Sequence, residues 1–153
     1  MDNNLTDSNT TYGTNALPYN ISGINNTAIG VSIMTESLDT NNNTSVGAYS
    51  LSKNSDGLNN TSMGTNALLN NETGNYNVAY GAACLMLNGN GISNTGLGTN
   101  SLQNNTEGSY NVAIGTQSTT EKFNVSGNVR VNGQVYVDVP TTHIPTIWAS
   151  CCN

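Results

Sequence analysis

The sequence predicts an all-β protein whose main part is a parallel β-solenoid, a chain wound into stacked coils. Three observations predict it: glycines recur every 17 residues, large and small residues alternate before each of them, and asparagine fills one repeat position. The 153 residues include 29 Asn, 20 Thr, 16 Gly and 15 Ser, with 35% hydrophobic and 8% charged residues. Ordinary globular domains have about 45–50% apolar and about 25% charged residues. Repeat structure is therefore favoured over a large globular core.

The repeat is defined by two glycine series that stay in phase. The first series keeps its 17-residue spacing without insertion, and Thr40 interrupts the second. Seventeen residues are too few for a helix-pair repeat, and Gly and Asn disfavour helices. Each unit is therefore interpreted as one coil, stacked at about 4.8 Å on the next. The first series is Gly13, Gly30, Gly47, Gly64, Gly81, Gly98 and Gly115, and the second is Gly23, Gly57, Gly74, Gly91 and Gly108.

The three residues that directly precede each glycine of the first series alternate between two faces, which is typical of a strand. One face carries large apolar residues such as Ile29 and Ile114, and the other carries small residues such as Ala28. In six of the seven units, leucine or methionine follows four residues after the glycine. We expect the apolar strand residues to be buried with these leucines, and the small face to allow close approach of another strand layer.

Asparagine fills one repeat position in every unit and a second position in all but one, where Ser37 stands. Equivalent residues of a solenoid lie above one another, so their amides can hydrogen-bond along the column as a ladder. The alternative is a row of amides that binds a ligand, but a position filled in every unit favours the structural interpretation. The predicted ladder is Asn9, Asn26, Asn43, Asn60, Asn77, Asn94 and Asn111, and the second column is Asn20, Asn54, Asn71, Asn88 and Asn105.

One chain has a thin core. Each coil offers about two large apolar side chains, worth roughly 1.5–3 kcal/mol each when buried, whereas ordering each residue costs about 1–2 kcal/mol. Oligomerisation is the usual remedy for so small a core.

Two segments carry a resemblance to a known family. Asn26-Thr27-Ala28-Ile29-Gly30 and Asn111-Val112-Ala113-Ile114-Gly115 resemble the head repeats of YadA-type trimeric adhesins, in the longer form found in phage tail fibres and large-virus fibre proteins. The resemblance covers about residues 9–119. It implies a left-handed parallel β-roll of seven coils, three identical chains about a common axis, and an attachment function. The lack of an apparent secretion signal or membrane-anchor segment favours a virion or phage fibre over a bacterial surface adhesin.

The expected organisation has four parts. An N-terminal arm spans residues 1–8, the solenoid head 9–119, a β-stalk 120–139 and a C-terminal cap or attachment segment 140–153. Residues 123–137 alternate apolar and polar positions, as a strand does, and resemble the segment that follows such heads in tail fibres. Pro140 and Pro145 then break the pattern.

Chemistry-bearing residues are scarce. His143 is the single histidine and has no evident catalytic partner, whereas general base catalysis needs positioned neighbours. Cys84 stands at a small-residue position and is expected to be buried. Cys151 and Cys152 are possible interchain contacts, with reduced thiols, interchain disulfides and a metal site as alternatives. The acidic residues show no metal-ligand spacing. We expect no catalytic, metal or cofactor site.

The composition also excludes classes of partner. The net charge is −6 with three basic residues, so nucleic-acid binding through phosphate neutralisation is not expected. Membrane insertion is not expected either, because no apolar run of about 18 residues occurs. Many Asn-X-Ser/Thr sequences arise from the repeat and matter only in a glycosylating compartment.

The expected function is a structural trimeric fibre or adhesin on a virion surface or phage tail fibre. Its partners would be two identical chains, other fibre or capsid proteins and a surface glycan. The alternatives are a spacer or decoration fibre without receptor binding, and a passenger fragment of a bacterial trimeric autotransporter adhesin on a bacterial cell surface. A polysaccharide depolymerase is a more distant alternative. Such an enzyme needs paired carboxylates about 5–9.5 Å apart, and no coil offers an obvious pair.

Overall fold

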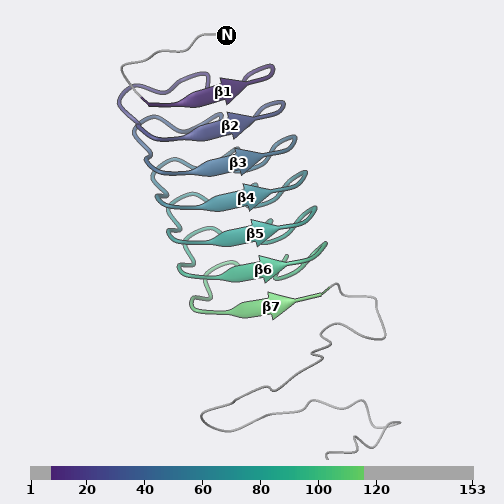
Figure 1. The fold of residues 1–153 in the computed structure, drawn as a ribbon. Coiled ribbons are helices and arrows are strands. Elements are labelled where there is room, and N and C mark those ends of the chain that lie inside the picture. Colours follow the sequence, from purple (N-terminus) through teal and green to yellow (C-terminus); the bar gives the residue numbers. More distant parts are fainter. Residues whose placement is uncertain (1–7, 116–153) are drawn as a thin grey trace, which may run out of the picture. The chain divides into compact units, whose positions relative to one another are not determined.

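The computed structural model describes residues 8–115, and these form a parallel β-solenoid (Figure 1). Its single sheet has seven strands in sequence order, each paired in parallel with the next, and the described residues contain no helix. The predicted all-β solenoid is confirmed. The strands are β1 (Thr10–Tyr12), β2 (Thr27–Ile29), β3 (Thr44–Val46), β4 (Thr61–Met63), β5 (Val78–Tyr80), β6 (Thr95–Leu97) and β7 (Val112–Ile114).

The register between coils is the sequence repeat itself. Thr61 of β4 pairs with Val78 of β5, and Met63 pairs with Tyr80, so partners are 17 residues apart. Backbone hydrogen bonds also join the coils outside the strands, for example from Leu51 N to Ala67 O at 2.9 Å. Each coil therefore uses the one above and the one below to satisfy its backbone groups, in the 17-residue register of the repeat.

The repeated glycine is required by the stacking. Gly64 has a φ of 135°, and a Cβ built on it would lie 2.6 Å from the carbonyl oxygen of Gly81 in the next coil. Residues other than glycine rarely adopt such a φ, and the close approach of the two backbones leaves no space for a side chain. Gly13, Gly30, Gly47, Gly81 and Gly98 also combine a positive φ with a close approach to the carbonyl oxygen of the glycine in the next coil.

The core is a column of leucine and methionine beside the small face of the strands. Leu51, Leu68 and Leu85 are fully buried, and so are Ala28 and Ala79 of the strands. Each leucine adopts a left-handed backbone conformation, with φ near 50°. That conformation costs about 1–2 kcal/mol, and burying the side chain returns about 1.5–3 kcal/mol.

The two strand faces lie on the opposite sides from those expected. The small residues point into the coil, whereas Ile29 and Ile114 are 36% and 39% exposed in the single chain. The interior is narrow because the leucine column already fills it, so only Ala, Ser, Thr or Gly fits on the inward side of the strand. The small face therefore belongs to the coil's own core and cannot receive another layer of strands.

Candidate assembly interface

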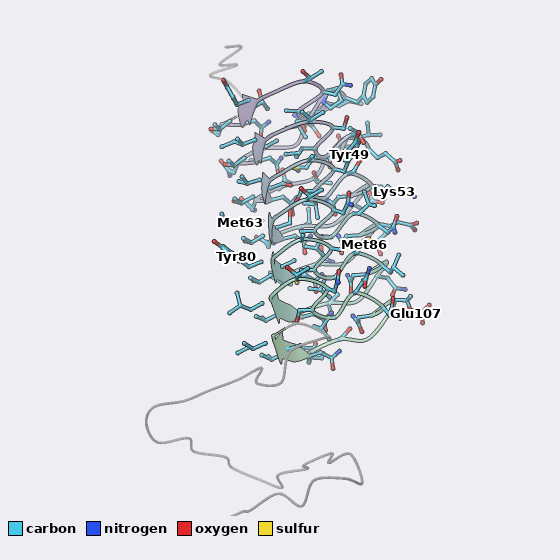
Figure 2. The ribbon with its side chains drawn as sticks, turned by 90° about the vertical axis from the view of Figure 1, so that its right-hand side faces the viewer. Tyr49, Lys53, Met63, Tyr80, Met86 and Glu107 are labelled. Carbon is cyan, nitrogen blue, oxygen red and sulfur yellow. The ribbon has the colours of Figure 1, made fainter. Side chains whose placement is uncertain are left out.

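The outward face of the sheet carries an apolar column that we call the strand face. Figure 2 shows Met63 and Tyr80 of this column projecting on the strand side of the solenoid. The apolar residues of this column are exposed in the single chain, Tyr80 at 54%, except for Val46, which is half-buried. Contiguous apolar surface of this kind marks an interaction site. The strand face consists of Tyr12, Ile29, Val46, Met63, Tyr80, Leu97 and Ile114, flanked by Thr10, Thr27, Thr44, Thr61, Val78, Thr95 and Val112.

Charged residues are absent from the strand face. All the charged side chains of residues 8–115 are exposed and occur six to nine residues after a repeated glycine. Lys53 and Glu107 lie on the side of the solenoid opposite Met63 and Tyr80 (Figure 2). An interface that buries the strand face would therefore leave no charge unpaired and desolvated. The charged residues are Glu36, Asp39, Lys53, Asp56, Glu72 and Glu107.

The first asparagine column is hydrogen-bonded from coil to coil. Oδ1 of Asn77 accepts from the backbone N–H of Asn94 at 3.0 Å, and Nδ2 of Asn77 donates to the carbonyl oxygen of Gly91 at 2.8 Å. Amide-to-amide bonds run alongside, as from Nδ2 of Asn94 to Oδ1 of Asn77 at 3.1 Å. The five central members of the column are fully buried. The column thus ties side chains to the backbone as well as to each other, and it leaves no amide free for a ligand.

The second asparagine column shares acceptors with the first. Nδ2 of Asn71 donates to Oδ1 of Asn54 at 2.8 Å and to the carbonyl oxygen of Gly74 at 2.9 Å. That glycine oxygen also accepts from Nδ2 of Asn60 at 2.8 Å. Because a carbonyl oxygen has two lone pairs, both are used, and the two columns form one network.

The network is interrupted in one coil, where Ser37 and Thr40 replace the asparagine and the glycine. Oγ of Ser37 donates to the carbonyl oxygen of Asn54 at 2.7 Å, so it does not donate to Oδ1 of Asn20. Oδ1 of Asn20 and Oγ1 of Thr40 are buried without a hydrogen-bond partner. Two buried oxygens without a partner destabilise this contact between coils.

Cys84 lies in the core, as expected from its position in the repeat. It is fully buried, and a Cβ built on Gly96 of the next coil would collide with its Sγ. Burial raises the pKa of the Cys84 thiol to about 11, and a backbone hydrogen bond with Tyr80 offsets part of that rise. Since the thiolate is the reactive form of cysteine, this thiol is inert at neutral pH.

Several predicted features fall outside the described residues. These are the stalk, the C-terminal segment with His143, Cys151 and Cys152, and all of the N-terminal arm except Ser8. Within residues 8–115 no group of three or more His, Cys, Asp or Glu side chains could hold a metal ion. That part of the chain also contains no helix long and apolar enough to cross a membrane.

Comparisons with known proteins do not assign the chain to a family. No protein-family model matches it, and neither a curated protein nor a solved structure matches it. The resemblance to adhesin heads therefore rests on the repeat residues alone.

Proposed function

We propose that the chain is a structural fibre protein that assembles as a homotrimer through its strand face and presents the repeat head for attachment to a host or partner surface. The observation that carries this proposal is the continuous apolar column, which runs through all seven strands on a charge-free side of the solenoid. The resemblance to adhesin head repeats supports three identical chains, a left-handed coil and a place on a virion surface or phage tail fibre.

The energetics of one chain support self-association. Most coils bury one large side chain from the leucine column, and one coil also buries Ile33. Met63 and Tyr80 on the strand face are 36% and 54% exposed. Burying the exposed part of these residues against two other copies would add a share of the roughly 1.5–3 kcal/mol that full burial of such a side chain contributes, in every coil of each chain. The threonines of the flanking column are short, so the strands of neighbouring chains can approach closely.

The surfaces that remain free in such a trimer support attachment. Tyr76 and Tyr110 are 62% and 75% exposed and lie two coils apart, outside the strands. Both adopt left-handed backbone conformations, with φ of 58° and 62°. The same repeat position is left-handed in other coils, where Asn25, Asn42, Asn59 and Ser93 stand, so this backbone conformation belongs to the repeat. Burial does not explain a tyrosine there. Exposed aromatic rings among Asn, Ser and Thr suit a surface glycan, whose sugar rings offer apolar faces and hydroxyl groups.

Two measurements test the proposal. Size-exclusion chromatography with light scattering at low micromolar concentration should give about three times 16.0 kDa, and a folded monomer would contradict the trimer. A glycan array probed with the purified trimer then tests attachment. We expect binding to a defined glycan class and its loss in Tyr76→Ala/Tyr110→Ala. A trimer that binds no glycan would favour the spacer fibre without receptor binding.

A further inference from the structure

Within residues 8–115 the possible N-glycosylation sites differ in their exposure to solvent. Acceptor sequences of the form Asn-X-Ser/Thr are abundant in the repeat. In residues 8–115 the asparagines of some are exposed, namely Asn25, Asn42 and Asn104, whereas those of others are fully buried, namely Asn43, Asn60 and Asn71. The exposed and buried members are neighbours in sequence, since Asn42 directly precedes Asn43.

The amide nitrogens of the buried asparagines are all held in hydrogen bonds. Both hydrogens of Asn71 are used, in the bonds to Oδ1 of Asn54 at 2.8 Å and to the carbonyl oxygen of Gly74 at 2.9 Å. Nδ2 of Asn43 likewise donates to Gly57 O at 2.9 Å and to Asn26 Oδ1 at 3.4 Å.

Glycosylation would break these bonds. The enzyme transfers an oligosaccharide from a lipid-linked diphosphate donor: the bond between the sugar's C1 and the diphosphate oxygen breaks, C1 bonds to Nδ2, and one amide proton leaves to solvent. The product keeps a single N–H and carries a sugar ring next to the amide. A side chain with no exposed surface cannot hold that ring while its amide stays between two coils.

We infer that N-glycosylation at Asn43, Asn60 or Asn71 is incompatible with the solenoid, whereas glycosylation at Asn25, Asn42 or Asn104 is compatible with it. Transfer occurs on the unfolded chain as it is made, so burial in the finished coil gives no protection. A chain that is modified at one of the buried acceptors therefore cannot complete the solenoid. This inference does not depend on the proposed fibre function.

The buried acceptor sequences can be removed without touching the asparagines. Ser45→Ala and Ser62→Ala remove those of Asn43 and Asn60, in a column where Ala28 and Ala79 already occur. Thr73→Ala removes that of Asn71 at an exposed position. The exposed acceptors at Asn25, Asn42 and Asn104 remain in this triple variant, so the same enzyme can still modify the chain.

Wild type and the triple variant would be made in the secretory pathway of a eukaryotic cell line, and also in a bacterial cytosol as a folded reference. Glycan occupancy would be measured by mass spectrometry in the protease-resistant fraction. We expect glycans at the exposed sites, none at Asn43, Asn60 or Asn71, and a several-fold higher resistant yield for the triple variant. A resistant fraction with a glycan at a buried site, or equal yields of both chains, would overturn the inference.

A second pair of variants tests the inference without any glycan. Asn71→Lys and Asn104→Lys, both made in the bacterial cytosol, add bulk at a buried and at an exposed acceptor. We expect Asn71→Lys to lose its protease-resistant core and Asn104→Lys to keep it. Equal resistance of both would show that the buried column tolerates an enlarged side chain, which would refute the inference.

Discussion

Ser37 and Thr40 depart together from the Asn and Gly of the other coils, and the space between the two positions explains why. A Cβ built on Gly74 would collide with Oδ1 of Asn71, and a Cβ on Gly57 would collide with Oδ1 of Asn54. The asparagine thus leaves no space for a side chain three residues later, and the carbonyl oxygen of the glycine in the next coil is a second obstacle. Ser37 is shorter and makes room for the side chain of Thr40, but it leaves Asn20 Oδ1 without a donor.

We expect the double variant Ser37→Asn/Thr40→Gly to be more stable than wild type by about 1–3 kcal/mol, because it supplies a donor for the buried Oδ1 of Asn20 and removes the unpaired Oγ1 of Thr40. Each single change should be destabilising. Ser37→Asn alone places a carboxamide against the side chain of Thr40, and Thr40→Gly alone leaves a void. Urea unfolding of all four chains gives the coupling free energy of the two sites. Additive effects would show that the positions are independent.

The asparagine column should contribute strongly to stability. Asn77→Ala and Asn94→Ala each remove an acceptor for a backbone N–H, buried at Asn94 and part-buried at Asn111, and a donor to a glycine carbonyl. We expect a loss of about 1–3 kcal/mol per orphaned group, measured as a lower thermal midpoint. Asn90→Ala is the control: Asn90 is exposed, and such changes usually stay within about 0.5 kcal/mol. Equal midpoints for all three would mean that the column has no stabilising role.

A charge on the strand face should abolish assembly. Ile29→Asp or Ile114→Asp would place a carboxylate where the proposed trimer has no partner for it, and light scattering should show loss of the trimer. Asn90→Asp is the matched control, because its repeat position already holds Asp39, Asp56 and Glu107 in other coils. If the charged strand-face variants remain trimers as stable as the control, the interface lies elsewhere.

The stability of the coil should fall as the pH rises from about 9 to about 11. The folded-state pKa of Cys84 is raised from 9.0 to about 11, so in this range the folded chain holds a proton that the unfolded chain has released, and raising the pH favours unfolding. The contribution is fully present below pH 9. In Cys84→Ala, with alanine as at Ala67 in the same column, the part of the decline due to Cys84 should disappear. An identical decline in both chains would rule out the thiol as its cause.

The strands and their register were predictable from the sequence because both follow from one period. Residues 17 apart lie above one another in a solenoid, so the alternation before each glycine locates the strands, and the fixed asparagines locate the columns. The leucine column was also predicted to be buried, and Leu51, Leu68 and Leu85 are. These features need only the repeat and the period of a strand.

Which strand face is inside was decided by the tertiary structure. Alternation defines two faces, and the general preference for burying large apolar residues placed Ile29 and Ile114 inward. The leucines, in left-handed turns, fill the narrow interior from the other side, so only small residues fit opposite them. The partners of the asparagines were hidden for a similar reason: Asn77 and Gly91 are 14 residues apart, and only the closed coil brings amide and carbonyl to 2.8 Å. The sequence by itself determined the period, and the closure of the coil decided which atoms meet.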